Sequence, residues 1–244
     1  LQRATHANDL SQAALVPLCA ALGEHVVSCV VSADRAIEGL PFGAAVDLDQ
    51  RRHIEEMAAG ALARTALDGA YHPAEGSASF EEAARPATEE ELREAGVFFA
   101  AEDCPDARDF PDARGVYLAS DGAAALSVTV NRAEHLTFRA TSTSNLSAAF
   151  ASLVAALEQT ESKLKEEYDG ALFARLPRLG YVTSDPAALG CAFFAQVVVR
   201  LPKMARRSDF VHLASSRGVE IKRAAPPAHP PTAAPNKGAP PSDQ

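Results

Sequence analysis

The sequence predicts an α+β domain with a mainly antiparallel sheet flanked by helices. Three observations lead to this prediction: apolar, β-branched runs outnumber helical patterns, most of these runs are joined by short turns, and the long amphipathic segments stand apart from them. Length and composition agree, because 244 residues with 47% hydrophobic side chains can bury a sizeable core.

The first predicted elements lie between residues 10 and 67. Leu10–Leu22 has apolar residues at helical spacing around a central proline, which predicts a short, interrupted amphipathic helix. His25–Ser32 is largely apolar and β-branched, as is typical of a buried strand. Asp47–Leu67 has apolar residues near one helical face and charged residues, including Arg51 and Glu55, opposite them, so we expect an amphipathic helix.

The middle of the chain turns from helix to strand. Residues 88–91, one Thr followed by three Glu, are typical of the first turn of a helix, where the helix dipole favours acidic side chains. Strands are predicted at Val97–Ala100, Gly115–Ala119 and Ala125–Val130. The Asp121-Gly122 dipeptide separates the last two apolar runs, which indicates a hairpin.

The last third predicts one long helix and several shorter elements. Asn145–Tyr168 repeats leucines and a phenylalanine at helical spacing and ends in a charged segment. Strands are expected at Gly180–Thr183 and Phe193–Leu201, and a final helix at Ser208–Arg217 is followed by a strand at Val219–Lys222.

Charge and cysteine usage exclude several classes of protein. The formal net charge of -9 disfavours a nucleic-acid surface, which needs clustered Lys and Arg. No apolar run reaches the roughly 18 residues that would span a bilayer. The cysteines form no C-x-x-C pair and have no histidine at ligand spacing, so we expect no zinc site but thiols in a reducing compartment: Cys19, Cys29, Cys104 and Cys191.

Several ordered motifs carry a resemblance to a known family. The run from Arg178 to Cys191, RLGYVTSDPAALGC, and the following FFAQVVVRLPKM resemble D-R-L-G-F-L-T-x-C-P-T-N-L-G-T and x-R-A-S-V-H-I-K-L-P-K-L of phosphagen (guanidino) kinases such as arginine and creatine kinases. Four further segments resemble family motifs in the same order: Val27 to Ala36 with Gly39 to Gly43, then GAYHP from Gly69, RGVY from Arg114, and VNRAEHLT from Val130.

This resemblance covers about Val26 to Lys222 and implies the glutamine-synthetase/guanidino-kinase catalytic-domain fold, in truncated form, because the family's preceding helical domain and its last region have no counterpart in the sequence. We therefore divide the chain into an N-terminal helical extension (residues 1–25), a guanidino-kinase-like catalytic-domain fold (26–222) and a Pro/Ala-rich extended tail (223–244). The tail has too little apolar side-chain area to fold alone.

The resemblance also implies where the chemistry of active members would lie, and the residues there differ. Active members transfer the terminal phosphoryl of MgATP to a guanidinium nitrogen, and arginines neutralise the phosphate charge. Their arginine positions are occupied here by other residues: Val30, Ser32, Thr137 and Phe194, with a fifth near Ala224 or Ala225. None of these side chains replaces a guanidinium fork.

The guanidinium-binding side has changed in the same way. Arg132 and Ala133 stand where the family has paired acids, and a positive charge at Arg132 would repel a guanidinium. The motif's cysteine is replaced by Asp185 and its asparagine by Ala188. We therefore expect no enzyme activity and assign no catalytic, cofactor-binding or metal residues.

The residues that match the family are of structural character, in turns and packing positions: Arg35, Pro41, Phe42, Gly115, Tyr117, His135, Gly180, Pro186, Gly190, Leu201 and Pro202. His135 is interpreted as a structural histidine that is hydrogen-bonded within the sheet. Arg139 lies two residues after Thr137 on the same strand face, so a partly restored phosphate contact stays an alternative.

These observations lead to one main hypothesis and two alternatives. The main one is a non-catalytic, structural or accessory subunit of a larger assembly, with the 223–244 tail packed on a partner subunit. The chain begins at Leu1 rather than Met, so we expect a fragment or a processed form, and a mitochondrial complex is favoured over a plastid or cytoplasmic one. The alternatives are a nucleotide-sensing pseudokinase and an active guanidino or protein-arginine kinase.

Overall fold

The computed structural model describes residues 25–42, 45–74, 112–120, 124–143, 145–217 and 220–221. The chain divides into two compact units, Leu1–Arg200 and Leu201–Gln244.

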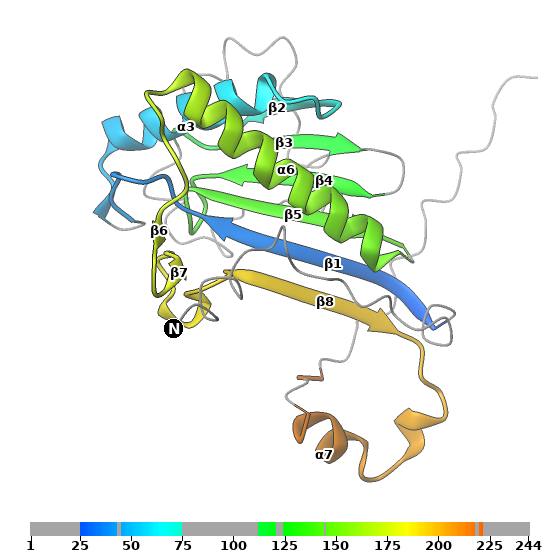
Figure 1. The fold of residues 1–244 in the computed structure, drawn as a ribbon. Helices are drawn as coiled ribbons and strands as arrows, with labels where there is room; N and C mark the ends of the chain where they lie inside the picture. The colour runs from blue at the N-terminus through cyan, green and yellow to red at the C-terminus, as the bar shows by residue number, and fades with distance from the viewer. Residues whose placement is uncertain are drawn as a thin grey trace, which may run out of the picture. The chain divides into compact units, whose positions relative to one another are not determined.

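The first unit is built on a six-stranded sheet in which every neighbouring pair of strands is antiparallel. The strand order is β2-β3-β4-β5-β1-β8, and two helices lie across one face (Figure 1). The predicted α+β class is therefore confirmed. The strands are β1 (Val26–Arg35), β2 (Gly69–Pro73), β3 (Gly115–Ser120), β4 (Ala125–Val130), β5 (Leu136–Ser142) and β8 (Phe193–Val199).

The long strand β1 lies between β5 and β8 near one end of the sheet. It confirms the predicted strand at His25–Ser32 and extends it to Arg35. Its side chains alternate, so that Cys29, Val31 and Ala33 are fully buried in the core while the residues between them are half-buried on the other face. Cys29 and Cys191 are both free thiols.

Helix α3 (Leu48–Ala63) begins at a capping box. The Asp47 carboxylate accepts from the Gln50 amide at 2.8 Å, and the Gln50 side chain accepts from the Asp47 amide at 3.0 Å. The helix confirms the amphipathic prediction but ends before the predicted Leu67. The prediction that Arg51 and Glu55 lie on an exposed face is wrong, since both are buried.

The burial of Glu55 has a clear physical reason. Strand β2, which was not predicted, packs against α3, and the Tyr71 hydroxyl donates to the Glu55 carboxylate at 2.9 Å. Burial, followed by the charge of Glu55, raises the pKa of Tyr71. The carboxylate therefore has a partner inside the fold, which a helical-wheel argument cannot foresee.

Helix α6 (Leu146–Glu167) is capped by Asn145, whose side chain accepts from the Ala148 amide at 3.0 Å. It confirms the helix predicted at Asn145–Tyr168. The helix packs on β5, β1 and α3. Gly60 of α3 leaves room for the Tyr168 hydroxyl at the end of α6, where a side-chain carbon would collide with it.

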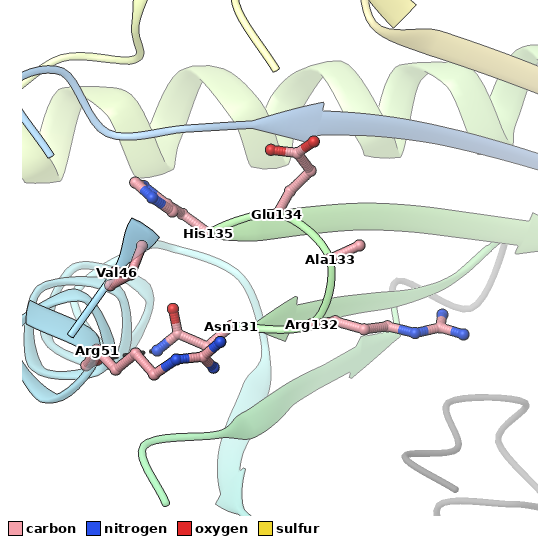
Figure 2. A pocket seen from close by; sticks show the side chains of 7 residues that line it. All are labelled: Val46, Arg51, Asn131, Arg132, Ala133, Glu134 and His135. Carbon is pink, nitrogen blue, oxygen red and sulfur yellow. Dashed lines mark hydrogen bonds between the residues drawn. The ribbon is translucent and has the colours of Figure 1, made fainter. Parts of the chain in front are cut away.

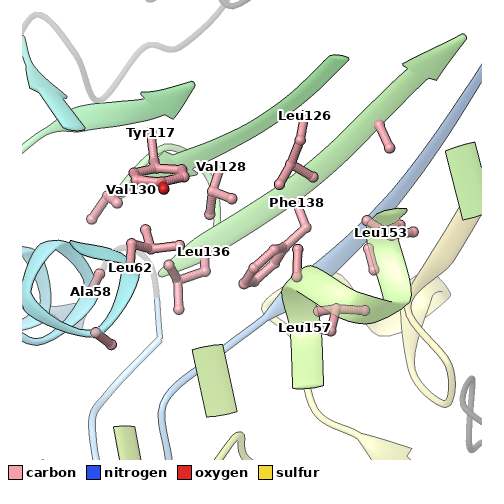
Figure 3. Close-up of a cluster of buried hydrophobic side chains, with 14 of the residues drawn as sticks. Ala58, Leu62, Tyr117, Leu126, Val128, Val130, Leu136, Phe138, Leu153 and Leu157 are labelled. Carbon is pink, nitrogen blue, oxygen red and sulfur yellow. The ribbon is translucent and has the colours of Figure 1, made fainter. Parts of the chain in front are cut away.

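The core lies between the two helices and the sheet (Figure 3). Ala58 and Leu62 of α3 and Leu153 and Leu157 of α6 meet the inward side chains of the strands. Phe138 of β5 is fully buried, and its ring meets that of Phe173 edge to face at 6.0 Å between centroids.

Strands β3 and β4 confirm the predicted hairpin pairing, with Tyr117 opposite Val128. The turn dipeptide itself lies outside the described residues. Strand β5 was not predicted as a separate element, although the alternation of Leu136, Phe138 and Ala140 inward with Thr137 and Arg139 outward is a strand signal.

Smaller elements follow α6. Strands β6 (Arg175–Leu176) and β7 (Gly180–Tyr181) form a two-stranded sheet, so the predicted strand at Gly180–Thr183 is confirmed in shorter form. The 3-10 helix η4 (Pro186–Ala188) then leads to β8, which confirms the strand predicted from Phe193.

The second unit contains a 3-10 helix, η5 (Met204–Arg206), and a short α-helix, α7 (Phe210–Ser215). The helix confirms part of the prediction for Ser208–Arg217. Of the strand predicted at Val219–Lys222, the two described residues, 220 and 221, are not in a strand. No helix in the described parts of the chain is long and apolar enough to cross a membrane.

Several predictions fall outside the described residues. They are the helical extension before residue 25, the helix start at residues 88–91, the strand at Val97–Ala100 and the Pro/Ala-rich tail. They stay predictions.

Candidate functional site

The candidate site lies on the face of the sheet opposite the helices. Ser32 of β1 pairs with Arg139 of β5 on one side and with Phe194 of β8 on the other. Val30 and Thr137 occupy the same face by the alternation of their strands. The structure therefore brings together, on three adjacent strands, the four positions at which the resemblance places phosphate-binding arginines.

Two of these positions hold uncharged side chains, Thr137 and Phe194. The Thr137 hydroxyl donates to the Asp34 carboxylate at 2.7 Å, across the β1–β5 pair. Burial raises the pKa of Asp34, while the Thr137 hydrogen bond and the charges of Arg35 and Arg132 oppose that rise. Phe194 is 49% exposed, so this face presents an apolar ring in the place of a guanidinium.

Arg139 of β5 places a positive charge on this face, at a position other than the four named above. Arg139 is half-buried, and burial, then the charge of Arg132, lowers the pKa of its guanidinium. Arg132 and Arg139 thus lie close enough to repel each other. Nucleotide sensing would need further cations on this face, and Arg178, one candidate, lies in the turn between β6 and β7.

The loop between β4 and β5 carries the positions of the family's paired acids. Asn131 opens it in the left-handed backbone region, at φ 54°, and its amide donates to the carbonyls of Arg51 at 2.9 Å and Ala113 at 2.6 Å. The backbone N–H of Asn131 donates to the His135 carbonyl at 2.9 Å, and this hydrogen bond closes the loop. The loop is held by the fold and keeps its shape without the acids.

This loop borders a cavity of about 10 Å³, room for one water molecule at most. Figure 2 shows that the Arg132 side chain extends away from Arg51 and that the Glu134 carboxylate points toward β1. Small-molecule pockets usually have a volume of about 300 Å³ or more. The lining residues are Val46, Arg51, Asn131, Arg132, Ala133, Glu134 and His135.

Glu134 ties this loop to the segment before η4. Its Oε1 accepts from the Ser184 amide at 2.7 Å and also from the Ser184 hydroxyl. Burial raises the pKa of the Glu134 carboxyl, although both hydrogen bonds from Ser184 oppose this. The carboxylate is engaged by the protein backbone and by a side chain of the protein itself.

Asp185 stands in the position of the family's cysteine and has a structural partner. Its Oδ1 accepts from the Ala187 amide at 2.9 Å and caps η4. Ala188, in the position of the family's asparagine, is buried at the end of the same turn. Asp185 has no thiol and Ala188 has no side-chain amide, in contrast to the family's motif.

His135 is buried, and both ring nitrogens meet backbone groups of the segment after β1. Nδ1 accepts from the Ile37 amide at 3.0 Å, so Nε2 carries the proton and donates to the Pro41 carbonyl at 2.7 Å. Burial lowers the pKa of the ring, which favours the neutral form. His135 is therefore hydrogen-bonded as interpreted, although its partners lie in the segment after β1 and not within the sheet.

Arg35, which also matches the family's motif, likewise makes structural contacts inside the fold. Its guanidinium carbon lies 3.6 Å from the centroid of the Tyr181 ring, and its Nη1 donates to the carbonyls of Asp34 and Cys191. Burial lowers the pKa of Arg35. The side chain connects β1 to β7 and to the segment just before β8. The guanidinium is buried inside the fold.

The described residues contain no group of three His, Cys, Asp or Glu side chains that could hold a metal ion. What the arrangement offers chemically is a polar sheet face with hydroxyls, one half-buried arginine and an exposed phenyl ring. Two of its contacts have no signal in the sequence alone: Thr137 with Asp34, and Glu134 with Ser184. Both join residues about fifty or more positions apart.

The antiparallel sheet with helices on one face defines the catalytic-domain fold of guanidino kinases. It is similar to the crystal structure of lombricine kinase, with a TM-score of 0.71 over 85% of this chain and 56% of that one, at 22% identity. It is also similar to the substrate-free duplicated taurocyamine kinase from Schistosoma mansoni, with a TM-score of 0.70 over 92% of this chain and 30% of that one, again at 22% identity.

The chain belongs to the ATP:guanido phosphotransferase family, because the model of its C-terminal catalytic domain matches residues 56–225. It is 27% identical over 208 residues to the arginine kinase of Liolophura japonica, covering 82% of this chain and 55% of that protein. It is 26% identical over 209 residues to the arginine kinase of Limulus polyphemus, covering 82% and 54%. The chain thus spans about half the length of the curated relatives it matches.

Proposed function

We propose that this protein is a non-catalytic member of the guanidino kinase family that serves as a structural or accessory subunit of a larger assembly. The observation that carries the proposal is the convergence of the four replaced arginine positions on one face of the sheet. Ser32 pairs with Phe194 across β1 and β8, and Thr137 is bonded to Asp34. A phosphoryl group in transfer needs several fixed cations around its oxygens, and these side chains supply none.

The guanidinium side supports the same proposal. Ala133 offers no carboxylate, and one oxygen of the neighbouring Glu134, Oε1, accepts hydrogen bonds from Ser184. Asp185 uses its carboxylate as a helix cap. A substrate guanidinium would meet Arg132 and no acid placed as the family's motif places it, so binding would be weak.

The role in an assembly rests on composition. The tail at 223–244 combines Ala, Pro and polar residues that cannot form a core alone, and a partner surface would provide one. We propose partner protein subunits, no nucleic acid, and an organellar complex, with the mitochondrion favoured.

Purification from the native source under gentle conditions, followed by native gel electrophoresis and mass spectrometry, tests this role. We expect the chain to migrate in a large particle with other subunits. A chain that migrates alone would contradict the accessory-subunit role.

A second function, nucleotide sensing without catalysis, is favoured by one observation. Arg139 is paired with Ser32 on the face where active members would bind phosphate, and burial, then the charge of Arg132, lowers the pKa of its guanidinium. Thermal unfolding with millimolar MgATP and MgADP tests it. A nucleotide that binds the folded state must raise the midpoint temperature, so an unchanged midpoint eliminates the sensor.

A further inference from the structure

Strand β8 is the last strand of the six-stranded sheet. In the described part of the chain it pairs with β1 on one side and with no strand on the other. An edge strand presents a row of unpaired N–H and C=O groups, and proteins usually protect it with charged side chains or proline. The seven residues of β8, FFAQVVV, contain neither.

The direction of the backbone groups follows from the two ends of the strand. The Ala192 carbonyl accepts from the Asp34 amide at 3.0 Å, and the Arg200 amide donates to the His25 carbonyl at 2.7 Å. Even-numbered residues therefore direct their backbone groups toward β1, and the odd-numbered ones direct theirs outward, because the direction alternates along an antiparallel strand. The outward set is Phe193, Ala195, Val197 and Val199.

We propose that this edge pairs with the β8 edge of a second copy of the chain, antiparallel and with the two-fold axis at Gln196. In this register Phe193 is opposite Val199 of the second copy, and Ala195 is opposite its Val197. Every outward residue meets another outward residue, so each pair exchanges both hydrogen bonds. Two six-stranded sheets would then join into one continuous sheet.

The side chains fit a second copy in the same register. Phe194, which is 49% exposed, comes to lie opposite Val198 of the second copy, and aromatic rings pair well with β-branched side chains across antiparallel strands. Gln196 meets its own counterpart at the axis, where two amides can bond to each other. Val199 is also exposed at 37%, so the strand has apolar surface to cover at its end.

Charge explains why a second copy is acceptable at this edge. The chain carries a formal net charge of -9, which opposes self-association in general. Strand β8 contributes no charge, so the two edges can approach without placing like charges opposite each other. Phe194 stands where the resemblance places an arginine, and a guanidinium there would have charged this surface in both copies.

This inference does not rest on the proposed function, because a self-pairing edge is compatible with an enzyme and with a structural subunit. Analytical ultracentrifugation of the full chain over a concentration series tests it. We expect a monomer–dimer equilibrium. Gln196→Glu and Gln196→Lys each place two like charges opposite each other at the axis, so each should weaken dimerisation by about tenfold or more.

Mixing the two variants provides the decisive arm, because Glu and Lys at the axis attract each other. The mixture should dimerise more tightly than either variant does alone. Ala63→Glu is the matched control: Ala63 is exposed at the end of α3, which packs against β2 at the opposite edge of the sheet, and this variant should dimerise as the wild type does. Circular dichroism shows whether each variant is folded.

Three results would overturn the proposal. A wild-type chain that stays monomeric at all concentrations leaves the edge without a second copy. A dimer that both charged variants preserve has its interface elsewhere. A mixture that forms no dimer excludes pairing at Gln196.

Discussion

The two faces of the central sheet differ in burial and in the residues they carry. On the helix-covered face, Val31, Phe138 and Leu153 are completely buried, and the arginine, tyrosine and histidine that match the family are held by the fold. The opposite face carries the four positions at which the resemblance places the arginines of active members: Val30, Ser32, Thr137 and Phe194. The difference teaches that the packing of this fold depends on the first face, whereas residues of the second face can differ with little effect on the core.

The largest expected difference in the free energy of unfolding is between alanine variants of two phenylalanines, one on each face of the sheet. Phe138→Ala removes a fully buried ring that packs on Phe173, and the cavity left behind should lower the free energy of unfolding by about 3–5 kcal/mol. Phe194→Ala removes a half-exposed ring and should cost less than about 1 kcal/mol. Urea denaturation of both variants measures the difference, and equal losses would break the contrast.

The loop between β4 and β5 should depend on Asn131 for its shape. Asn131→Ala leaves two buried carbonyls without their donor and puts alanine in a left-handed conformation, so we expect a loss of about 2–3 kcal/mol. The comparison variant is Asn145→Ala, which removes an exposed helix cap worth about 1 kcal/mol. Urea denaturation decides, and a smaller loss at Asn131 would mean that the loop is not held as described.

His135 should make stability depend on pH. Burial lowers its pKa below the ordinary value of about 6.5, so the unfolded chain binds a proton more readily than the folded chain. The stability that the neutral ring contributes is complete above about pH 6.5, the ordinary pKa of histidine. It is lost progressively as the pH falls from there through the lower pKa of the folded state. The free energy of unfolding of the wild type should therefore fall between about pH 7.5 and pH 5.5 relative to His135→Gln.

The exposed His53 provides the control for this measurement. His53→Gln should follow the wild-type pH profile, because it changes an exposed side chain of α3 and leaves the buried ring of His135 in place. The expectation would be contradicted if the free energy of unfolding of His135→Gln changed with pH in parallel with that of the wild type. Protonation of His135 would then not destabilise the folded state.

The smallest effect is expected at Asp185. Asp185→Ala removes the cap of η4 and should cost about 1 kcal/mol, whereas Asp185→Asn keeps an accepting oxygen and should cost less. Asp185→Cys restores the residue type of active members and should yield no phosphoryl transfer. Turnover by this variant would mean that one thiol was the only missing part of the site.

Much of the fold could be predicted because local patterns and the family's motifs agree. The capping residues of α3 and α6 and the apolar run of β8 lie where sequence patterns place them. Strand β2 could not be predicted, since GAYHP is too short and mixed to stand out, and it forms by pairing with β3. The burial of Arg51 and Glu55 also depends on tertiary partners.

The sequence could predict which positions of the candidate site differ from the family's motifs. It could not predict how these residues lie in space or which residues they contact. The sequence alone marks Thr137 and Asp185 as departures from the family, yet it does not reveal that Thr137 bonds to Asp34 or that Asp185 caps a turn. Such contacts depend on strand register, which joins residues far apart in the chain. The same register reveals that the replaced positions share one face.

Phosphoryl transfer is the most direct test of the central claim that this face no longer catalyses. The full chain is incubated with MgATP and, in turn, with arginine, creatine and an arginine-bearing protein, while ADP release is measured and an active arginine kinase serves as positive control. We expect no turnover above the uncatalysed background with any substrate. Turnover that Arg139→Ala abolishes would contradict this account and would place catalysis on the open face of the sheet.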